Sequence, residues 1–304
     1  MNTAICVREI SKSFGNFSAV NQLSFTVQQG DIYGFLGPNG SGKSTTLRMM
    51  MGLIKPSAGD IEIFGTSLSL HRHSIMRKVG CIIEKPDFYG YMSALDNLKL
   101  FARANLLTYS PKQYQDLFHL VGLTGREKDK VKTYSHGMKQ RLGLAQALIH
   151  DPELIILDEP NTGLDPQGII DLRNLILQLN QERGKTILFS SHILTEVQQL
   201  CNRMVVINKG KSVVEGKVEE LLSTESMHVR IELSQLDKAI ESINQSTYRP
   251  KLVNIDDHLF RFKMSKQEIP ELLRFFMDQQ IDILRVDYRN ELEEYFLKIT
   301  TDQS

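Results

Sequence analysis

A stretch near the N-terminus reads Gly37-Pro38-Asn39-Gly40-Ser41-Gly42-Lys43-Ser44-Thr45. It matches the pattern G-x-x-x-x-G-K-[ST], whose glycines let backbone N–H groups wrap around phosphate oxygens. An apolar run at 32–36 precedes it and helix-forming residues at 45–51 follow it, so the strand, loop and helix that the pattern requires are all present. We therefore predict a phosphate-binding loop at a helix N-terminus, where the helix dipole also favours anions.

The residue types in this loop predict a nucleotide and a metal ion as ligands. Lys43 is expected to reach the β- and γ-phosphates, and the hydroxyl of Ser44 to bind Mg²⁺. The stretch from Gly37 to Thr45 as a whole is expected to line the nucleotide site. The alternative is a chance glycine-rich turn, which would need strand, helix, lysine and serine to fall in register by coincidence.

The composition limits the classes of function. The chain has 304 residues, enough for one large domain or two of ordinary size, and we expect two. Lys plus Arg and Asp plus Glu both number 36, which argues against binding nucleic acid by bulk electrostatics but leaves a local basic patch open. No window approaches the roughly 18 apolar residues of a membrane span, and residues 1–10 lack a signal-peptide core, so we expect any membrane role to be peripheral.

The three cysteines, Cys6, Cys81 and Cys201, are scattered and lack metal-binding spacing. An odd number without such spacing suits reduced thiols in a cytosolic chain. Their expected role is packing in the core.

An aromatic residue before the loop is a candidate for the nucleotide base. Residues 4–27 alternate in polarity around a turn at 14–16, which predicts two antiparallel strands at a sheet edge. Phe14 lies 29 positions before Lys43 and could stack on an adenine ring, an interaction of order 1–3 kcal/mol per base. The alternatives are that Phe14 fills the core, or that Phe17 stacks instead.

The middle of the chain predicts a helical insertion in an α/β domain. An apolar strand pattern at 77–83 stops at Glu84. Helical patterns follow at 88–105 and 112–121, with a turn at 122–125. Ser135 then occupies the N-cap position of a further helix, and Gly137 lies in its first turn. A serine hydroxyl, free N–H groups and a dipole end make a second anion-binding surface, although taken alone this is an ordinary helix cap.

Two buried strands end in polar groups suited to catalysis. The apolar run 154–157 is followed directly by Asp158 and Glu159. Beside the phosphate loop, Asp158 would hold Mg²⁺ directly or through water, and Glu159 would polarise the water that attacks the γ-phosphate. The strand at 186–191 delivers His192, which can hydrogen-bond a γ-phosphate, although a lone histidine before a helix is more often structural.

These motifs together resemble the ATP-binding subunits of ATP-binding-cassette (ABC) transporters, over residues 1 to about 220. The phosphate loop, the signature-like residues 134–141, the Asp-Glu pair, Leu164-Asp165 and His192 follow the order found in that family. The resemblance implies that two such domains face each other head to tail, with each ATP between one phosphate loop and the partner's Ser135 and Gly137. It also implies that His192 is a switch histidine and Asp165 a dimer contact.

Two departures from the family pattern narrow the match. His136 and Met138 replace a glycine and a glutamine of the usual signature. Glu84, 41 residues after Lys43, stands where most members have a glutamine, and we expect it to approach Mg²⁺. With Phe88-Tyr89 following, it is similar to export ATPases that protect against bacitracin and lantibiotics. The alternative is that Glu84 is a neutral variation and the cargo another drug, a lipid or an unknown compound.

The C-terminal part predicts a second, small domain at 221–304. Residues 218–224 look like a helix leading into a linker. The following patterns give the order β-α-β-β-α-β, which suggests a ferredoxin-like unit, with an amphipathic helix at 291–299 after it. The domain carries no catalytic constellation, and dimer packing or regulation is the preferred interpretation.

The predicted fold class is α/β: a P-loop NTPase domain of ABC type at 1–220, with a mixed sheet core, an antiparallel β edge and a helical subdomain, followed by a small α+β domain. The predicted function is ATP hydrolysis that powers export through a separate permease. With one phosphate loop per chain, we expect a homodimer, peripheral on the cytoplasmic face of the membrane, with no nucleic-acid partner. A soluble ABC ATPase acting on DNA or ribosomes and an importer subunit are the alternatives.

Overall fold

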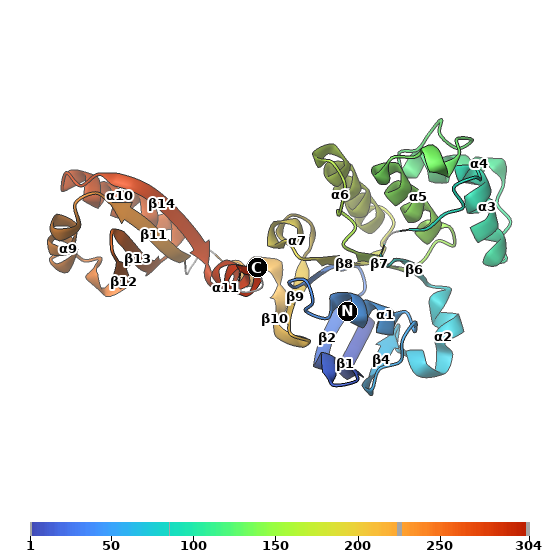
Figure 1. The fold of residues 1–304 in the computed structure, drawn as a ribbon, viewed down its shortest axis with the longest axis horizontal. Coiled ribbons are helices and arrows are strands. Elements are labelled where there is room, and N and C mark those ends of the chain that lie inside the picture. Colours follow the sequence, from blue (N-terminus) through green and yellow to red (C-terminus); the bar gives the residue numbers. More distant parts are fainter. Residues whose placement is uncertain (1, 85, 224–226, 302–304) are drawn as a thin grey trace. The chain divides into compact units, whose positions relative to one another are not determined.

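The computed structural model describes residues 2–84, 86–223 and 227–301 (Figure 1). The chain divides into two compact units, Met1–Val218 (unit 1) and Glu219–Ser304 (unit 2). The predicted helix near the boundary is α8 (Val218–Leu221), and the last residue of the predicted linker lies outside the described residues.

A six-stranded sheet forms the centre of unit 1, in the order β10-β9-β3-β8-β7-β6. Its strands are β3 (Ile32–Leu36), β6 (Val79–Ile82), β7 (Leu154–Asp158), β8 (Thr186–Ser191), β9 (Arg203–Asn208) and β10 (Lys211–Lys217). All run parallel except β10, which is antiparallel to β9. Strands β3, β7 and β8 are buried along their whole length, so their sequences are mostly continuous apolar runs. The carboxyl ends of the parallel strands therefore meet at one edge of the sheet.

The predicted antiparallel edge is present as a sheet of its own, in the order β2-β1-β4-β5. Its strands are β1 (Thr3–Phe14), β2 (Phe17–Gln28), β4 (Ala58–Ile63) and β5 (Thr66–Ser67). The hairpin of β1 and β2 closes at the pair Phe14 and Phe17, around the predicted turn.

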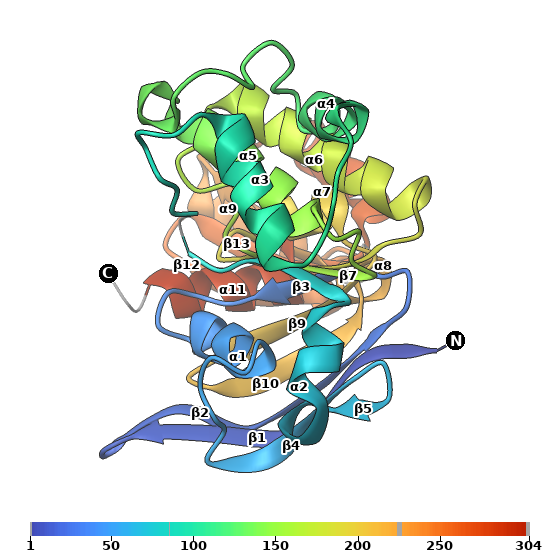
Figure 2. The same ribbon diagram turned by 90° about the vertical axis from the view of Figure 1, so that its right-hand side faces the viewer.

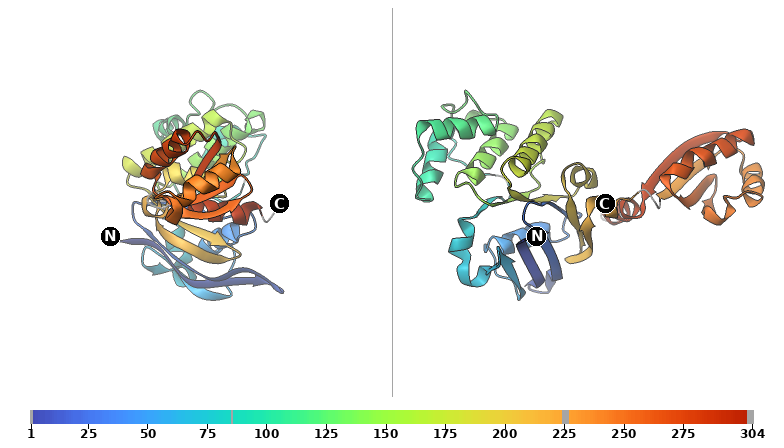
Figure 3. Two further views of the ribbon diagram at one scale, coloured as in Figure 1. Left: turned by 90° about the vertical axis from the view of Figure 1, so that its left-hand side faces the viewer. Right: turned by 180° about the vertical axis from the view of Figure 1, so that it is seen from behind.

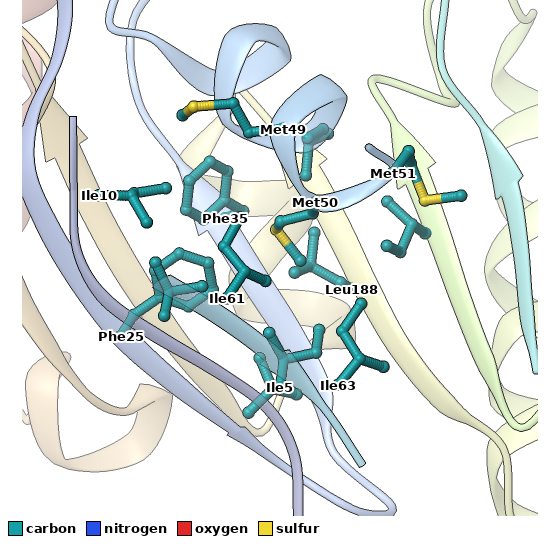
Figure 4. Close-up of a cluster of buried hydrophobic side chains, with 14 of the residues drawn as sticks. Ile5, Ile10, Phe25, Phe35, Met49, Met50, Met51, Ile61, Ile63 and Leu188 are labelled. Atoms are coloured by element: carbon teal, nitrogen blue, oxygen red, sulfur yellow. The ribbon is translucent and has the colours of Figure 1, made fainter. Parts of the chain in front are cut away.

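The main core of unit 1 lies between the two sheets and helix α1 (Lys43–Met50). Phe25 of β2 and Phe35 of β3 meet there with ring centroids 5.2 Å apart, in the same cluster as Met50 of α1 (Figure 4). Burial of each such side chain contributes about 1.5–3 kcal/mol. This packing fixes α1 against the sheet and so fixes the loop that precedes it.

Most other helices of unit 1 lie on the opposite side of the six-stranded sheet from α1 (Figure 2). They are α3 (Ala94–Ala104), α4 (Pro111–Leu120), α5 (His136–Leu148), α6 (Pro166–Gln181) and α7 (Leu194–Leu200). Ser93 and Ser110 cap α3 and α4 by accepting backbone hydrogen bonds of 3.0 and 3.3 Å. Two elements complete this part of the chain, helix α2 (Leu68–Met76) and the 3-10 turn η1 (Val131–Thr133). The predicted mixed sheet, antiparallel edge and helical insertion are confirmed.

Unit 2 is a four-stranded antiparallel sheet in the order β12-β13-β11-β14, with helices packed on it (Figure 3). Its elements are β11 (Met227–Leu233), α9 (Leu236–Asn244), η2 (Arg249–Lys251), β12 (Leu252–Asp256), β13 (Leu259–Met264), η3 (Lys266–Glu268), α10 (Ile269–Asp278), β14 (Ile283–Asn290) and α11 (Glu291–Thr301). Ile243 of α9 and Phe276 of α10 are fully buried in one core with Val229 and Phe262 of the sheet.

Within the described residues, no helix has the length and apolar character needed to cross a bilayer.

Candidate nucleotide-binding site

The loop between β3 and α1 is shaped by three glycines. Gly40 and Gly42 have φ angles of 74° and 103°, a left-handed backbone that residues with a side chain rarely adopt. A Cβ atom on Gly42 would lie 2.6 Å from the carbonyl oxygen of Ala19, and one on Gly37 would lie 2.5 Å from that of Ile207. The backbone at Gly37 and Gly42 is therefore packed too closely against its surroundings to admit a side chain.

Lys43 is buried at the start of α1 and folds back over the loop. Its Nζ donates to the carbonyl oxygens of Gly37, at 2.7 Å, and Pro38, at 3.1 Å. It also lies 3.2 Å from Oε1 of Glu159. Burial lowers the pKa of the Lys43 ammonium, and the Glu159 carboxylate opposes that shift.

Two buried hydroxyls also indicate that the loop is suited to a phosphate group. The buried hydroxyls of Ser41 and Thr46 have no hydrogen-bond partner among the described residues. Buried polar atoms are normally paired, so these two hydroxyls, one in the loop and one near the start of α1, are suited to phosphate oxygens. Ser44, half-buried in the first turn of α1, offers its hydroxyl at the same helix end.

The two carboxylates at the end of β7 have different surroundings. Asp158 is buried, and its Oδ1 accepts a hydrogen bond of 2.9 Å from Ser190 Oγ of β8. Glu159 has φ 45° and a partly exposed carboxylate that joins Lys43 through Oε1 and His192 Nδ1, at 3.1 Å, through Oε2. The structure thus brings Lys43, Glu159 and His192 into one chain of contacts, each delivered from the carboxyl end of a different parallel strand.

A magnesium ion would find part of its ligand set here. The Asp158 carboxylate and the Ser44 hydroxyl are hard oxygen donors of the kind that Mg²⁺ prefers, and phosphates and water would supply the rest. No group of three or more His, Cys, Asp or Glu side chains suited to a metal occurs among the residues that the structure describes.

Glu84 lies outside the Lys43–Glu159–His192 contacts. It has φ 67° and an exposed side chain that forms an ion pair with Arg48, one turn after Ser44 on α1. The ion pair holds the Glu84 carboxylate beside the helix that starts at the phosphate loop. The sequence did not reveal Arg48 as its partner.

Phe14 lies on the β1–β2 hairpin rather than in the core. Its side chain is 51% exposed, and that of Phe17, its cross-strand neighbour, is 64% exposed. The ammonium of Lys12 lies 5.3 Å from the centre of the Phe14 ring. The core-filling alternative therefore does not describe Phe14, and both rings are accessible for stacking on a base.

The signature-like residues form the start of α5. Ser135 is its N-cap, and its Oγ accepts a hydrogen bond of 3.2 Å from Met138 N. Gly137 lies in the first turn and is half-buried. Asp165 caps α6 in the same way, accepting from Gly168 N at 2.9 Å.

A contact that the sequence did not reveal joins the start of α5 to the loop after Glu159. His136 Nε2 lies 3.1 Å from the carbonyl oxygen of Thr162. Gly163, at φ 78°, lies against the same ring, because a Cβ there would be 2.8 Å from His136 Cδ2. The departure of His136 from the usual glycine was the only sequence signal of this contact.

The parallel sheet, the glycine loop with its buried lysine, and the carboxylates at the end of β7 define a phosphate-loop nucleotide hydrolase. The family model described as ABC transporter matches residues 20–162. The chain belongs to the ATP-binding proteins of ABC transporters, as full-length relatives show.

Two such relatives cover nearly the whole chain. The uncharacterized ABC transporter ATP-binding protein YhcH of Bacillus subtilis is 38% identical over 99% of this chain and 97% of its own. The bacitracin transport ATP-binding protein BcrA of Bacillus licheniformis is 39% identical over 98% of each chain. A solved ATP-binding subunit of an ABC transporter superposes with a TM-score of 0.65 and 29% identity, covering 72% of this chain and 91% of that one.

The family establishes the activity. The chain is an ATPase that binds and hydrolyses ATP as part of a transporter, as the sequence predicted. ATP-binding subunits of this kind work as dimers with a membrane permease.

Proposed function

We propose that this chain powers export of an antibiotic peptide, a drug or a similar amphipathic compound through a separate permease. The observation that carries the proposal is the match to BcrA of Bacillus licheniformis, which extends over both units of the chain. A bacitracin transport ATP-binding protein of Enterococcus faecalis, 35% identical over 98% of this chain, supports it. So does the linearmycin resistance ATP-binding protein LnrL of Bacillus subtilis, 37% identical over 70% of this chain.

The site residues take distinct roles in this proposal. The loop from Gly37 to Thr45, with Lys43, binds the phosphates, and Phe14 stacks on the adenine. Asp158 and Ser44 hold Mg²⁺, which neutralises charge on the phosphates when it is bound. Glu159 accepts the proton of the attacking water.

The contacts of Lys43 suggest how ATP prepares the site. Lys43 forms an ion pair with Glu159 across 3.2 Å. Phosphate oxygens carry more negative charge and would draw the ammonium away, which frees the carboxylate to accept a proton. His192, 3.1 Å from the other carboxylate oxygen, keeps Glu159 oriented during this exchange and can contact the γ-phosphate.

The assembly follows from the single phosphate loop. Two copies of the chain would form a sandwich in which Ser135 and Gly137 of one copy complete the ATP site of the other. Asp165 would lie near the contact between the copies. The dimer would sit on the cytoplasmic face of the membrane, bound to two permease halves. The importer alternative and an action on nucleic acid are not favoured by the relatives.

Purification of the chain with its membrane partner tests this proposal. Cells that carry the pair should exclude bacitracin-like peptides or other amphipathic compounds more strongly than cells that carry a Glu159→Gln pair. Recovery of the chain without any integral membrane protein, or equal sensitivity of the two strains to every compound, would contradict export.

The loop after Glu84 is suited to contact the permease. Tyr89 and Tyr91 are 49% and 70% exposed, and their ring centroids are 5.9 Å apart. The buried amide of Asn97 holds the backbone of Tyr89 by accepting from its N–H at 3.0 Å and donating to its carbonyl at 3.2 Å. Exposed aromatic side chains on a fixed backbone are typical of protein contacts.

Glu84→Gln should separate hydrolysis from export. The amide keeps nearly the same volume but loses the ion pair with Arg48. We expect the isolated subunit to keep its ATPase activity within about tenfold, or roughly 1.4 kcal/mol in the barrier, while export by the assembled transporter falls by a larger factor. Both rates are measured on one preparation.

Arg48→Met provides the matched control, because it removes the ion pair and keeps the Glu84 carboxylate. If Glu84 acts through its contact with α1, both variants should lose export to a similar extent. An equal loss of ATPase and export in Glu84→Gln, or no loss in either, would show that Glu84 has no role in coupling.

His136→Gly should slow turnover without weakening ATP binding. It removes the hydrogen bond to Thr162 and the ring beside Gly163, so the loop after Glu159 is no longer held against the start of α5. We expect kcat to fall roughly five- to tenfold, about the value of one hydrogen bond, with KM within about twofold. His136→Gln places a donor at the position of Nε2 and should restore most of kcat, whereas His136→Asn is too short and should not. An unchanged kcat in the glycine variant would rule out a positioning role.

A further inference from the structure

Strand β14 forms one edge of the sheet in unit 2. It pairs with β11 on one side, and on its other side no further strand is found among the described residues (Figure 1). It has 8 residues, whereas the opposite edge strand β12 has 5. Edge strands of soluble proteins are normally short, charged or covered, because their unpaired backbone groups can pair with another strand.

This edge carries a row of exposed apolar side chains. Leu284, Val286 and Tyr288 are 62%, 36% and 43% exposed. Val286 and Tyr288 lie opposite Ile231 and Val229 of β11, so they point to the same side of the sheet, and Leu284 lies where the pairing with β11 shifts register. The residues between them, Arg285 and Asp287, point to the other side.

We propose that β14 pairs antiparallel with β14 of a second copy, about a two-fold axis at Val286. In this register Val286 lies opposite its own copy, and Leu284 lies opposite Tyr288 on both sides of the axis. On the other face of the sheet, Arg285 lies opposite Asp287 twice. Apolar pairs and opposite charges directly across strands each contribute about 0.2–1 kcal/mol.

Neighbouring registers are disfavoured by the same residues. An axis at Asp287 would place Asp287 opposite itself and Arg285 opposite Arg289, and an axis at Arg285 would place that arginine opposite itself. A shift by one residue would set apolar side chains opposite charged ones, since it moves every side chain to the other face. Asp287 and Arg289 also form an ion pair within the strand, at 3.2 Å, on that face.

This contact rests on the proposed homodimer and adds to it. The ATP sandwich joins two copies through unit 1 and depends on nucleotide, whereas the β14 contact joins them through unit 2 and does not. It would keep two copies together between cycles of hydrolysis.

Cysteine cross-linking of the full-length chain without nucleotide tests the register. Val286→Cys should form a disulfide-linked dimer, because directly opposed residues in such a pair lie within the Cα separation of about 4.4–6.8 Å that a disulfide needs. Val253→Cys, on the opposite edge strand and 56% exposed, is the matched control and should stay monomeric on a non-reducing gel, as should the wild-type chain.

Two more variants test the pairing itself. Leu284→Cys and Tyr288→Cys should each stay monomeric alone, and a mixture of the two should form the cross-linked dimer. A monomeric Val286→Cys chain, or equal cross-linking at all four positions, would overturn the β14 contact. ATP hydrolysis by the same preparations is measured in parallel, because a loss of the proposed function would appear there and a loss of the β14 contact would not.

Discussion

Lys43→Ala should abolish detectable ATP binding. The ammonium is the one side-chain charge in a loop otherwise made of backbone groups, and it lies buried within 3.1 Å of two loop carbonyls. Loss of charge-assisted hydrogen bonds to two phosphates, at about 1.5–3 kcal/mol each, weakens ATP binding by roughly a hundredfold or more. Titration with a fluorescent ATP analogue measures the change.

Lys78→Ala is the matched control for the loss of one positive charge. Lys78 is half-exposed and paired with Glu153 on the surface, so this variant should bind ATP like the wild type. Circular dichroism and thermal melting of Lys43→Ala show whether its loop and fold persist. A folded Lys43→Ala chain with undiminished ATP affinity would disprove the assignment of the phosphate loop.

Glu159→Gln should trap the ATP-bound state. The amide keeps the shape of the side chain but cannot take up a proton, so we expect turnover to fall by roughly 10²–10⁴-fold. It also removes the ion pair with Lys43, which competes with phosphate oxygens for the ammonium, and ATP affinity should be retained or increased. Single-turnover hydrolysis and gel filtration with ATP measure the two effects, and an ATP-bound dimer should accumulate.

Glu153→Gln is the matched control, because it replaces a carboxylate by an amide at the residue just before β7. Its carboxylate is exposed and paired with Lys78, away from the contacts of Lys43. Turnover of this variant should match that of the wild type. Wild-type turnover in the Glu159→Gln variant would exclude Glu159 as the base. A monomeric gel-filtration profile with bound ATP would contradict the proposed ATP sandwich dimer.

The sequence predicted most of what depends on local pattern. The continuous apolar runs of β3, β7 and β8 were recognisable because both faces of those strands are buried. The phosphate loop, the cap at Ser135 and the helical insertion each follow from residue types a few positions apart. Helix α2 was missed, since its residues 68–76 include a kink at His71 and only two buried apolar side chains.

Contacts between residues far apart in the sequence could not be predicted and were seen only in the structure. The strand order β3-β8-β7 places Lys43 and Glu159 within 3.2 Å, and no spacing in the sequence fixes that order. The contact of His136 with Thr162 spans 26 residues and depends on the path of the loop after β7. The exposed edge of β14 became visible only once the sheet order of unit 2 was known.

The backbone of Glu159 has a consequence for how this protein can evolve. A non-glycine residue with φ 45° is strained by an amount of order 1–3 kcal/mol, and this turn is what aims the carboxylate at Lys43 and His192. Glycine or asparagine would relax the turn, and both would remove the base. Heat resistance and turnover therefore oppose each other at this residue. A selection of variants for thermal tolerance alone should enrich inactive replacements at position 159.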